Sequence, residues 1–194
     1  AASRVASAHR AKHGDSHHES QRFLAVSFPE DELLIMGYNR VVKDLLGRNK
    51  ADFLTQVGEV MDVEIGKGDS SPKSFGMYLD GEWYTLKARK DSYNAEDPVG
   101  RLDVSILQTQ VLAPLLGIKD PRRDDRIDFV GGIRGDGELE RRVANGWAVA
   151  FKLYPTSIQD LFDIADAEEV MPPKSTWFEP KLRDGLFVHQ IETF

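Results

Sequence analysis

Apolar residues recur at two spacings along this chain, and the two spacings predict where strands and helices form. Alternating or continuous runs of β-formers indicate strands, while apolar residues three and four positions apart indicate a helix face. We expect residues 23–28 and 33–38 to pair as antiparallel strands across the acidic turn 30–32. The pattern predicts further strands at 61–65, 74–79, 82–89, 126–132, 147–155 and 185–192.

Helical spacing and capping residues predict four helices between these strands. Asn49 or Asp52 can cap the first, and Thr156 or Ser157 can cap the last, because their side chains accept hydrogen bonds from free backbone N–H groups. The helices are expected at 50–60, 102–116, 136–146 and 158–169.

Two local signals fix the expected architecture. Asp80-Gly81 between apolar runs is typical of a type I′ hairpin turn. The nearly continuous apolar run at 147–155 favours a central strand that is covered on both faces. The fold class is therefore α/β (α+β), a mixed β-sheet with a hairpin-rich first half and alternating helices and strands in the second.

The beginning of the chain differs from the rest. "AASRVASAHRAKHG" is basic and helix-forming, but it lacks the small-residue cleavage pattern of a targeting peptide. We expect residues 1–20 to be a truncated helix and polar leader, followed by a single α/β domain at 21–194. On this interpretation the chain is the C-terminal part of a longer protein, whose N-terminal half is missing.

Charge and composition narrow the class of function. The net charge of −7 argues against a protein that coats nucleic acid, which normally carries a basic excess. No apolar run approaches the ~20 residues of a membrane span. The absence of cysteine excludes a thiol nucleophile and a cysteine zinc site, and it fits a reducing cytoplasm. Four of the five histidines lie in the leader and are interpreted as solvated, so we expect no metal ligands among them.

The strongest local signal is "RIDFVGGIRGDGE" at 126–138. Gly131 and Gly132 follow a strand, so their backbone N–H groups could bind an anion near Arg134 and a helix N-terminus. A tight turn with Arg134 in solvent explains the pattern equally well. Asp128 lies within the strand, either on a solvated face or in a cleft as a base or metal ligand. Asp103 is interpreted as stabilising the start of a helix through the helix dipole.

The segment "VMPPKSTWFEPKLRDGLF" at 170–187 contains lysines held by prolines. Pro172 and Pro173 fix the backbone before Lys174, and Pro180 does the same before Lys181. Rigid backbone is unsuited to wrapping a phosphate, yet it would hold cationic side chains in place as preorganised donors. The alternative is a stiff connector with solvated lysines.

Several blocks of the sequence resemble one family. "YNRVVKDL", "LDVSILQ", "LLGIKDPRRDDRIDFVGGIRG", "ELERRV", "MPPKSTWFEPKL" and "GLFVH" occur in this order and look like the C-terminal half of the family called domain of unknown function 1015. The resemblance implies an upstream "DGHHR"-type motif, which this chain does not contain. That motif is similar to the phosphate-binding Gly-x-His-Arg element of the ParB/sulfiredoxin superfamily, which includes free-serine kinases and DNA-binding partition proteins. Many members have His-Arg where this chain has Asn39-Arg40, so only the arginine role carries over.

These observations lead to the hypothesis of a phosphate- or nucleotide-binding enzyme that acts on a small phosphorylated or hydroxyl metabolite. It would be a phosphotransferase in serine or phosphoserine metabolism, with a nucleotide and Mg²⁺ as cofactors. The alternative is a non-catalytic nucleotide- or nucleic-acid-binding module related to partition proteins; a scaffold domain is the third possibility. The expected catalytic residues are Asp128, Lys174 and Glu179. The expected ligand-binding residues are Arg40, Gly131, Gly132, Arg134, Ser175, Thr176 and Lys181.

Overall fold

A computed structural model of the chain describes residues 7, 8, 10–12, 14, 22, 24–66, 71–181, 183 and 185–189. The residues group into two compact units. One is Ile35–Glu179, and the other combines Ala1–Leu34 with Pro180–Phe194. The six-stranded sheet and the helices that cover it belong to the first unit.

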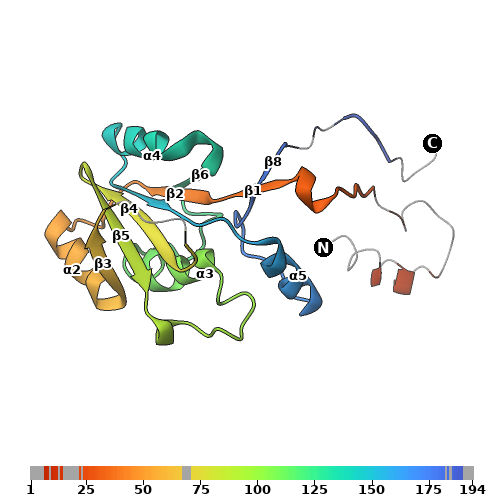
Figure 1. The fold of residues 1–194 in the computed structure, drawn as a ribbon, viewed down its shortest axis with the longest axis horizontal. Helices are drawn as coiled ribbons and strands as arrows, with labels where there is room; N and C mark the ends of the chain where they lie inside the picture. Colours follow the sequence, from red (N-terminus) through yellow and green to blue (C-terminus); the bar gives the residue numbers. More distant parts are fainter. Residues whose placement is uncertain are drawn as a thin grey trace. The chain divides into compact units, whose positions relative to one another are not determined.

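Six strands form the main sheet, in the order β3-β5-β4-β7-β2-β6. Each neighbouring pair is antiparallel, and the α+β class expected from the sequence is confirmed (Figure 1). The strands are β2 (Tyr38–Val42), β3 (Met61–Ile65), β4 (Ser74–Leu79), β5 (Glu82–Ala88), β6 (Ile127–Gly131) and β7 (Val149–Lys152).

The hairpin of β4 and β5 confirms the turn prediction. Asp80 and Gly81 both have positive φ, at 49° and 81°, as a type I′ turn requires. β7 lies between β4 and β2, and its residues Val149, Ala150 and Phe151 are fully buried. The continuous apolar run therefore forms a central strand, as expected.

Helices cover both faces of this sheet. α2 (Lys50–Val60) and α3 (Asp103–Leu107) lie on one side, and α4 (Gly135–Ala144) lies on the other (Figure 1). The side chain of Asn49 caps α2, and Ser157 forms a capping box with Asp160 at the start of α5 (Ile158–Asp166). Both caps lie at positions that the sequence indicated.

Strand alternation divides the core into two parts. Val42 and Phe151 belong to the larger cluster, with α2 and α3, while Val41 and Ala150 pack with Leu139 of α4. Arg40 pairs directly with Phe129 on β6 and with Phe151 on β7, so it shares the larger cluster's face. This register places a charged side chain on an otherwise apolar face.

Three element predictions are wrong. Residues 24–28 form no strand, and β1 (Leu34–Met36) pairs instead with β8 (Trp177–Glu179) in a separate two-stranded sheet. Residues 185–189 also form no strand. The long helix expected at 102–116 is α3 followed by a π-helical turn, η4 (Gln108–Leu112), and residues 113–116 are turns. Local β-propensity was overridden because partners for β1 and β2 come from distant parts of the chain.

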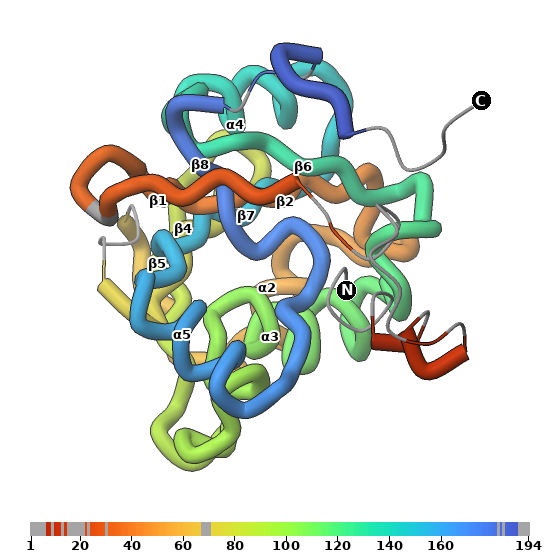
Figure 2. The backbone as a smooth tube through the Cα atoms, turned by 90° about the vertical axis from the view of Figure 1, so that its right-hand side faces the viewer, coloured from red at the N-terminus to blue at the C-terminus, as the bar shows by residue number. Residues whose placement is uncertain are grey.

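Short 3₁₀ turns complete the fold: η2 (Glu30–Glu32), η3 (Lys90–Ser92) and η5 (Gly132–Arg134). After α5, the chain returns to β8 beside β1 (Figure 2). Among the described helices, none has both the length and the apolar character needed to span a bilayer.

Candidate functional site

Arg40 is the most unusual residue of the sheet. Its side chain is only 3% exposed, and within the described part of the chain no carboxylate forms an ion pair with it. Its guanidinium donates to the carbonyls of Tyr38 and Lys174, the latter at 2.9 Å, and lies 5.5 Å from the Phe129 ring centroid. Burial lowers the pKa of Arg40 to about 10, because desolvation disfavours the charged form. A buried cation without a counter-ion is a strong candidate for binding an anion.

A cavity of about 490 Å³ opens at Arg40. This volume lies in the range of pockets that bind small molecules. Its apolar lining is contributed by Val104, Pro121, Pro172 and Pro173. Its polar lining consists of Arg40, Ser105, Gln108, Thr109, Lys119, Asp120 and Arg122.

The π-helical turn η4 shapes one wall of this cavity. π-turns inside helices are rare and are frequent at functional sites. Here the turn begins at Gln108, and the two residues that line the cavity are held in place by hydrogen bonds. The Gln108 amide donates to the Ile118 carbonyl at 2.7 Å, and the Thr109 hydroxyl donates to the Ser105 carbonyl at 2.9 Å. The wall is therefore preorganised.

Pro172 and Pro173 also line the cavity, and the conformation of their segment, 172–176, is fixed by several contacts. Lys174 has a φ of 57°, a left-handed conformation that is unusual for a residue other than glycine. The Ser175 hydroxyl donates to the Pro172 carbonyl at 2.5 Å, and Thr156 donates to the Ser175 carbonyl at 3.2 Å. The segment is as rigid as the prolines indicated. Ser175 is buried within it and serves its internal bonding.

The Lys174 side chain is exposed, with Nζ 5.5 Å from the Tyr38 ring centroid. The same Tyr38 ring contacts Trp177 edge-on at 5.2 Å. A Cβ atom on Gly131 would lie 2.4 Å from the Trp177 ring. Lys174 and the Gly131 turn therefore lie at the same end of the sheet. They lie on the face that also carries the side chains of Arg40 and Phe129.

The paired glycines have packing roles. Gly131 lies under the Trp177 ring, and the Gly132 N–H donates to the Gly37 carbonyl at 2.8 Å. A Cβ on Gly132 would lie 2.8 Å from that carbonyl oxygen. The Gly132 N–H is thus already bonded, and the close approaches explain both glycines without an anion. This agrees with the tight-turn interpretation of the sequence.

The structure does not bring the expected catalytic residues together. Asp128 lies on the face covered by α4, where it pairs with Arg142 at 3.0 Å, because strand alternation points it away from Phe129 and Arg40. Glu179 accepts a hydrogen bond from the Trp177 indole at 2.6 Å. Both carboxylates have structural partners within the chain.

The remaining predicted residues are dispersed. Arg134 is exposed at the start of α4, and Thr176 is half-buried in the 172–176 segment. Lys181 belongs to the other compact unit, so its expected role beside Arg134 stays a prediction.

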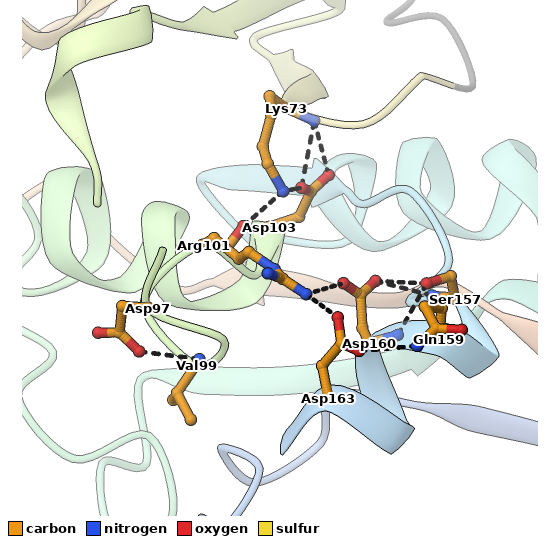
Figure 3. A network of polar contacts seen from close by, with 9 residues as sticks. All are labelled: Lys73, Asp97, Val99, Arg101, Asp103, Ser157, Gln159, Asp160 and Asp163. Atoms are coloured by element: carbon orange, nitrogen blue, oxygen red, sulfur yellow. Dashed lines mark hydrogen bonds and ion pairs between the residues drawn. The ribbon is translucent and has the colours of Figure 1, made fainter. Parts of the chain in front are cut away.

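A second, smaller cavity of about 240 Å³ is bordered by a network of charged groups (Figure 3). Asp103, at the first residue of α3, accepts from the Lys73 backbone N–H at 3.1 Å and from Lys73 Nζ at 3.0 Å. Arg101 bridges Asp163 and Asp160 on α5, the latter at 3.7 Å. Asp103 is thus a nearly buried ion-pair partner, in addition to lying at the helix start as predicted. The network joins α5 and the start of β4 to the helix that carries Ser105.

Burial raises the pKa of Asp103, and the attraction of Lys73 only partly offsets this effect, while the nearby Asp160 adds to it. In the folded state Asp103 therefore binds its proton more tightly than in the unfolded state. Between the unfolded and folded pKa values, the contribution of Asp103 to stability falls as pH rises. We expect the free energy of unfolding, relative to Asp103→Asn, to increase on acidification through this window. Urea unfolding of both proteins at several pH values measures the difference; a relative decrease on acidification contradicts it.

Sequence reasoning identified Arg40 but missed the other polar residues of its cavity. Ser105 lies within the buried run Val104–Leu107, so a hydroxyl in an apolar helix stripe was the available signal. Lys119 and Arg122 lie in the charged run 119–125, for which no site role was expected. Within the described ranges, no group of three or more His, Asp or Glu side chains is placed to hold a metal ion.

Several solved structures are similar to part of this chain at low sequence identity. Free serine kinase in complex with AMP is 10% identical, with a TM-score of 0.43 over 80% of this chain and 57% of that one. A mutant of free serine kinase in complex with ADP is 13% identical, with a TM-score of 0.43 and the same coverage. A conserved hypothetical protein from Pyrococcus furiosus is 10% identical, with a TM-score of 0.46 over 80% of this chain and 60% of that one. The chain thus spans 57% of the length of the kinase.

A comparison with curated proteins finds no match. Family comparison is more informative, because residues 1–105 match the family described as Protein of unknown function (DUF1015). The matched range covers just over half of the 194 residues and includes β1 to β5, Arg40, Asp103 and Ser105. The chain therefore belongs to the DUF1015 family.

Proposed function

We propose that this chain forms the phosphate-binding part of an enzyme that acts on a small molecule. The observation that carries the proposal is Arg40, a buried arginine that lacks a carboxylate partner in the described structure and lines a cavity of about 490 Å³. Charges are almost never fully buried unless they are paired, so an unpaired one indicates a ligand of opposite charge. Guanidinium groups suit phosphate because their planar fork can donate two parallel hydrogen bonds.

In this proposal the enzyme is a small-molecule phosphotransferase with a nucleotide and Mg²⁺ as cofactors, and serine or phosphoserine metabolism is the expected context. Enzymes of this kind act mainly by positioning the substrate and neutralising charge. Arg40 would bind a phosphate oxygen, and Lys119 and the exposed Lys174 would provide further positive charge. Asp128 and Glu179 receive no catalytic role in this proposal. The Asp128 carboxylate pairs with Arg142, and the Glu179 carboxylate accepts a hydrogen bond from the Trp177 indole. The proposal rests on the Arg40 cavity and not on the distant likeness to the free serine kinases.

Thermal unfolding of the complete protein with added ligands tests the proposal. The panel consists of ATP, ADP, AMP and O-phosphoserine, each with and without Mg²⁺. A ligand present at about 100 times its Kd stabilises the native state by about 2.7 kcal/mol, which raises Tm by roughly 5–10 °C for a chain of this size. We expect such a shift for at least one phosphate-bearing compound. Lys119→Ala should reduce this shift, whereas Lys87→Ala should not, because Lys87 lies on β5, where it pairs with Glu64 and does not line the cavity.

Turnover then separates the two main functions. The phosphotransferase proposal requires phosphoryl transfer to a hydroxyl-bearing metabolite, lowered at least tenfold by Lys174→Ala. Binding without turnover would favour a non-catalytic module, and a steep salt dependence of nucleic-acid binding would identify its ligand. No Tm shift with any phosphate compound would contradict phosphate binding itself.

A further inference from the structure

The hydroxyl of Ser105 has no hydrogen-bond partner among the described residues, although the residue is only 8% exposed. Buried polar groups are nearly always bonded, and a serine in a helix commonly bonds to a backbone carbonyl one turn earlier. Ser105 lines the Arg40 cavity. A ligand in the cavity could supply the partner that this hydroxyl lacks.

Arg40 presents further unused donors to the same cavity. Guanidinium has five N–H groups, and the described contacts of Arg40 use one for the Tyr38 carbonyl and one for the Lys174 carbonyl. These two bonds fix the orientation of the planar group, and three N–H donors are left over. The cavity thus combines a fixed cationic fork with a free hydroxyl.

Of the two polar neighbours of Ser105, only Gln108 keeps a donor that the described contacts do not use. The Thr109 hydroxyl proton is directed to the Ser105 carbonyl, and the Gln108 amide is held by Ile118. Donors to a ligand therefore come from Arg40, Ser105, Lys119 and the second N–H of the Gln108 amide. Donors from several directions match the spread of oxygens on a tetrahedral anion better than the two coplanar oxygens of a carboxylate.

Charge indicates which tetrahedral anion fits. Three cations line the cavity, Arg40, Lys119 and Arg122, together with one carboxylate, Asp120, so the net charge is +2. Asp120 accepts two hydrogen bonds from the Arg122 guanidinium, at 3.0 and 3.1 Å, which lower its pKa and keep it ionised. A phosphomonoester carries about −1.5 to −2 at neutral pH. It therefore balances the cavity, whereas a carboxylate or sulfonate leaves excess positive charge.

The apolar lining residues indicate what kind of organic group the ligand carries, here called its body. Pro172 and Pro173 have no backbone N–H, and with Pro121 and Val104 they form a wall without hydrogen-bond donors. A polyhydroxylated body would lose its hydration there without replacement. The part of the ligand that packs against this wall is therefore expected to be compact and apolar.

We propose that the Arg40 cavity is selective for the dianion of a small phosphomonoester, with Ser105 as the residue that determines this selectivity. Arg40 donates to two phosphate oxygens, the Ser105 hydroxyl donates to the third, and the organic group lies against the proline wall. This inference deepens the proposed function and rests on it, because it names the ligand class of the same site.

Isothermal titration calorimetry of the complete protein tests this selectivity with three probes of similar body: phenyl phosphate, benzenesulfonate and benzoate. We expect phenyl phosphate to bind at least tenfold more tightly than the other two at pH 7.5. Its affinity should fall several-fold as pH decreases through the second phosphate pKa, about 6, while benzenesulfonate affinity stays flat. Equal affinities for phosphate and sulfonate would overturn the proposal.

Ser105→Ala should weaken phenyl phosphate binding about tenfold or more, since hydrogen bonds to charged groups are the strong ones. It should leave benzoate nearly unchanged. Ser74→Ala is the matched control, because Ser74 is also a buried serine whose hydroxyl lacks a partner in the described structure, but it does not line this cavity. An unchanged affinity in Ser105→Ala would remove Ser105 from the site.

ATP serves as a fourth probe that separates this inference from the proposed function. If ATP binds and phenyl phosphate does not, the phosphomonoester assignment fails while nucleotide binding stands. If neither binds, both proposals fail. Binding of phenyl phosphate above ATP, lost in Ser105→Ala, supports both.

Discussion

Replacing Arg40 with methionine should lower the affinity for phosphate-bearing ligands by at least about 100-fold. The protein should remain folded. The loss follows because charge-assisted, bidentate contacts are the strongest hydrogen bonds available to a phosphate. Isothermal titration calorimetry measures the affinity, and urea unfolding measures stability. Arg40→Lys keeps the charge without the fork and should give an intermediate affinity.

The stability of Arg40→Met should differ little from that of the original protein. Burial lowers the pKa of Arg40 from its ordinary value to about 10, which corresponds to roughly 3 kcal/mol of desolvation cost at neutral pH, and methionine removes this cost. Against this gain, the carbonyls of Tyr38 and Lys174 lose a donor each, at about 1–3 kcal/mol in total. The free energy of unfolding should therefore change by no more than about 2 kcal/mol.

Arg126→Met is the matched control. Arg126 pairs with Asp124 at 2.8 Å and donates to the Leu116 carbonyl at 3.1 Å, and it does not line the cavity. Its replacement should lower stability and leave ligand affinity unchanged. If the free energy of unfolding of Arg40→Met instead falls by about 3–5 kcal/mol and the variant still binds the ligand, Arg40 is a structural residue and the proposed site is wrong.

Phe151→Ala should lower the free energy of unfolding by about 3–5 kcal/mol. Phe151 is fully buried on the central strand β7, where it faces Met77 on one side and Arg40 on the other. Removing its ring leaves a cavity between the two halves of the sheet. Urea unfolding with a shared m-value measures the loss.

Phe162→Ala makes the same chemical change on α5, where the ring is 52% exposed. It should cost well under 1 kcal/mol, because partly solvated side chains lose little on truncation. A similar cost at both positions would show that β7 is not the centre of the folded core.

Much of the fold could be predicted because its signals are local. The Asp80-Gly81 turn, the Asn49 and Ser157 caps and the apolar run of β7 each depend on neighbouring residues, and each formed as expected. The pairing of β1 and β2 could not be predicted in this way. β2 pairs with strands that follow it by about 90 and 110 residues, and no local pattern specifies such partners.

The candidate site was predictable only in part for a related reason. Arg40 drew attention through the family resemblance, and the prolines correctly indicated a rigid 172–176 segment. The sequence left the face of Asp128 open, because a residue's face depends on strand register, and register is set by the partner strand. The π-turn that forms the wall with Gln108 and Thr109 has no reliable signal in a single sequence.

The strand order has a consequence for how the protein can be divided. The family match ends at residue 105, yet the neighbours of β2 are β6 and β7, which begin at Ile127 and Val149. A fragment cut at that boundary would have both edges of β2 and one edge of β4 without partners. Such exposed edges promote aggregation. During synthesis the sheet can close only after β7 has left the ribosome, so the family boundary is a boundary of sequence similarity and not of an independently folding unit.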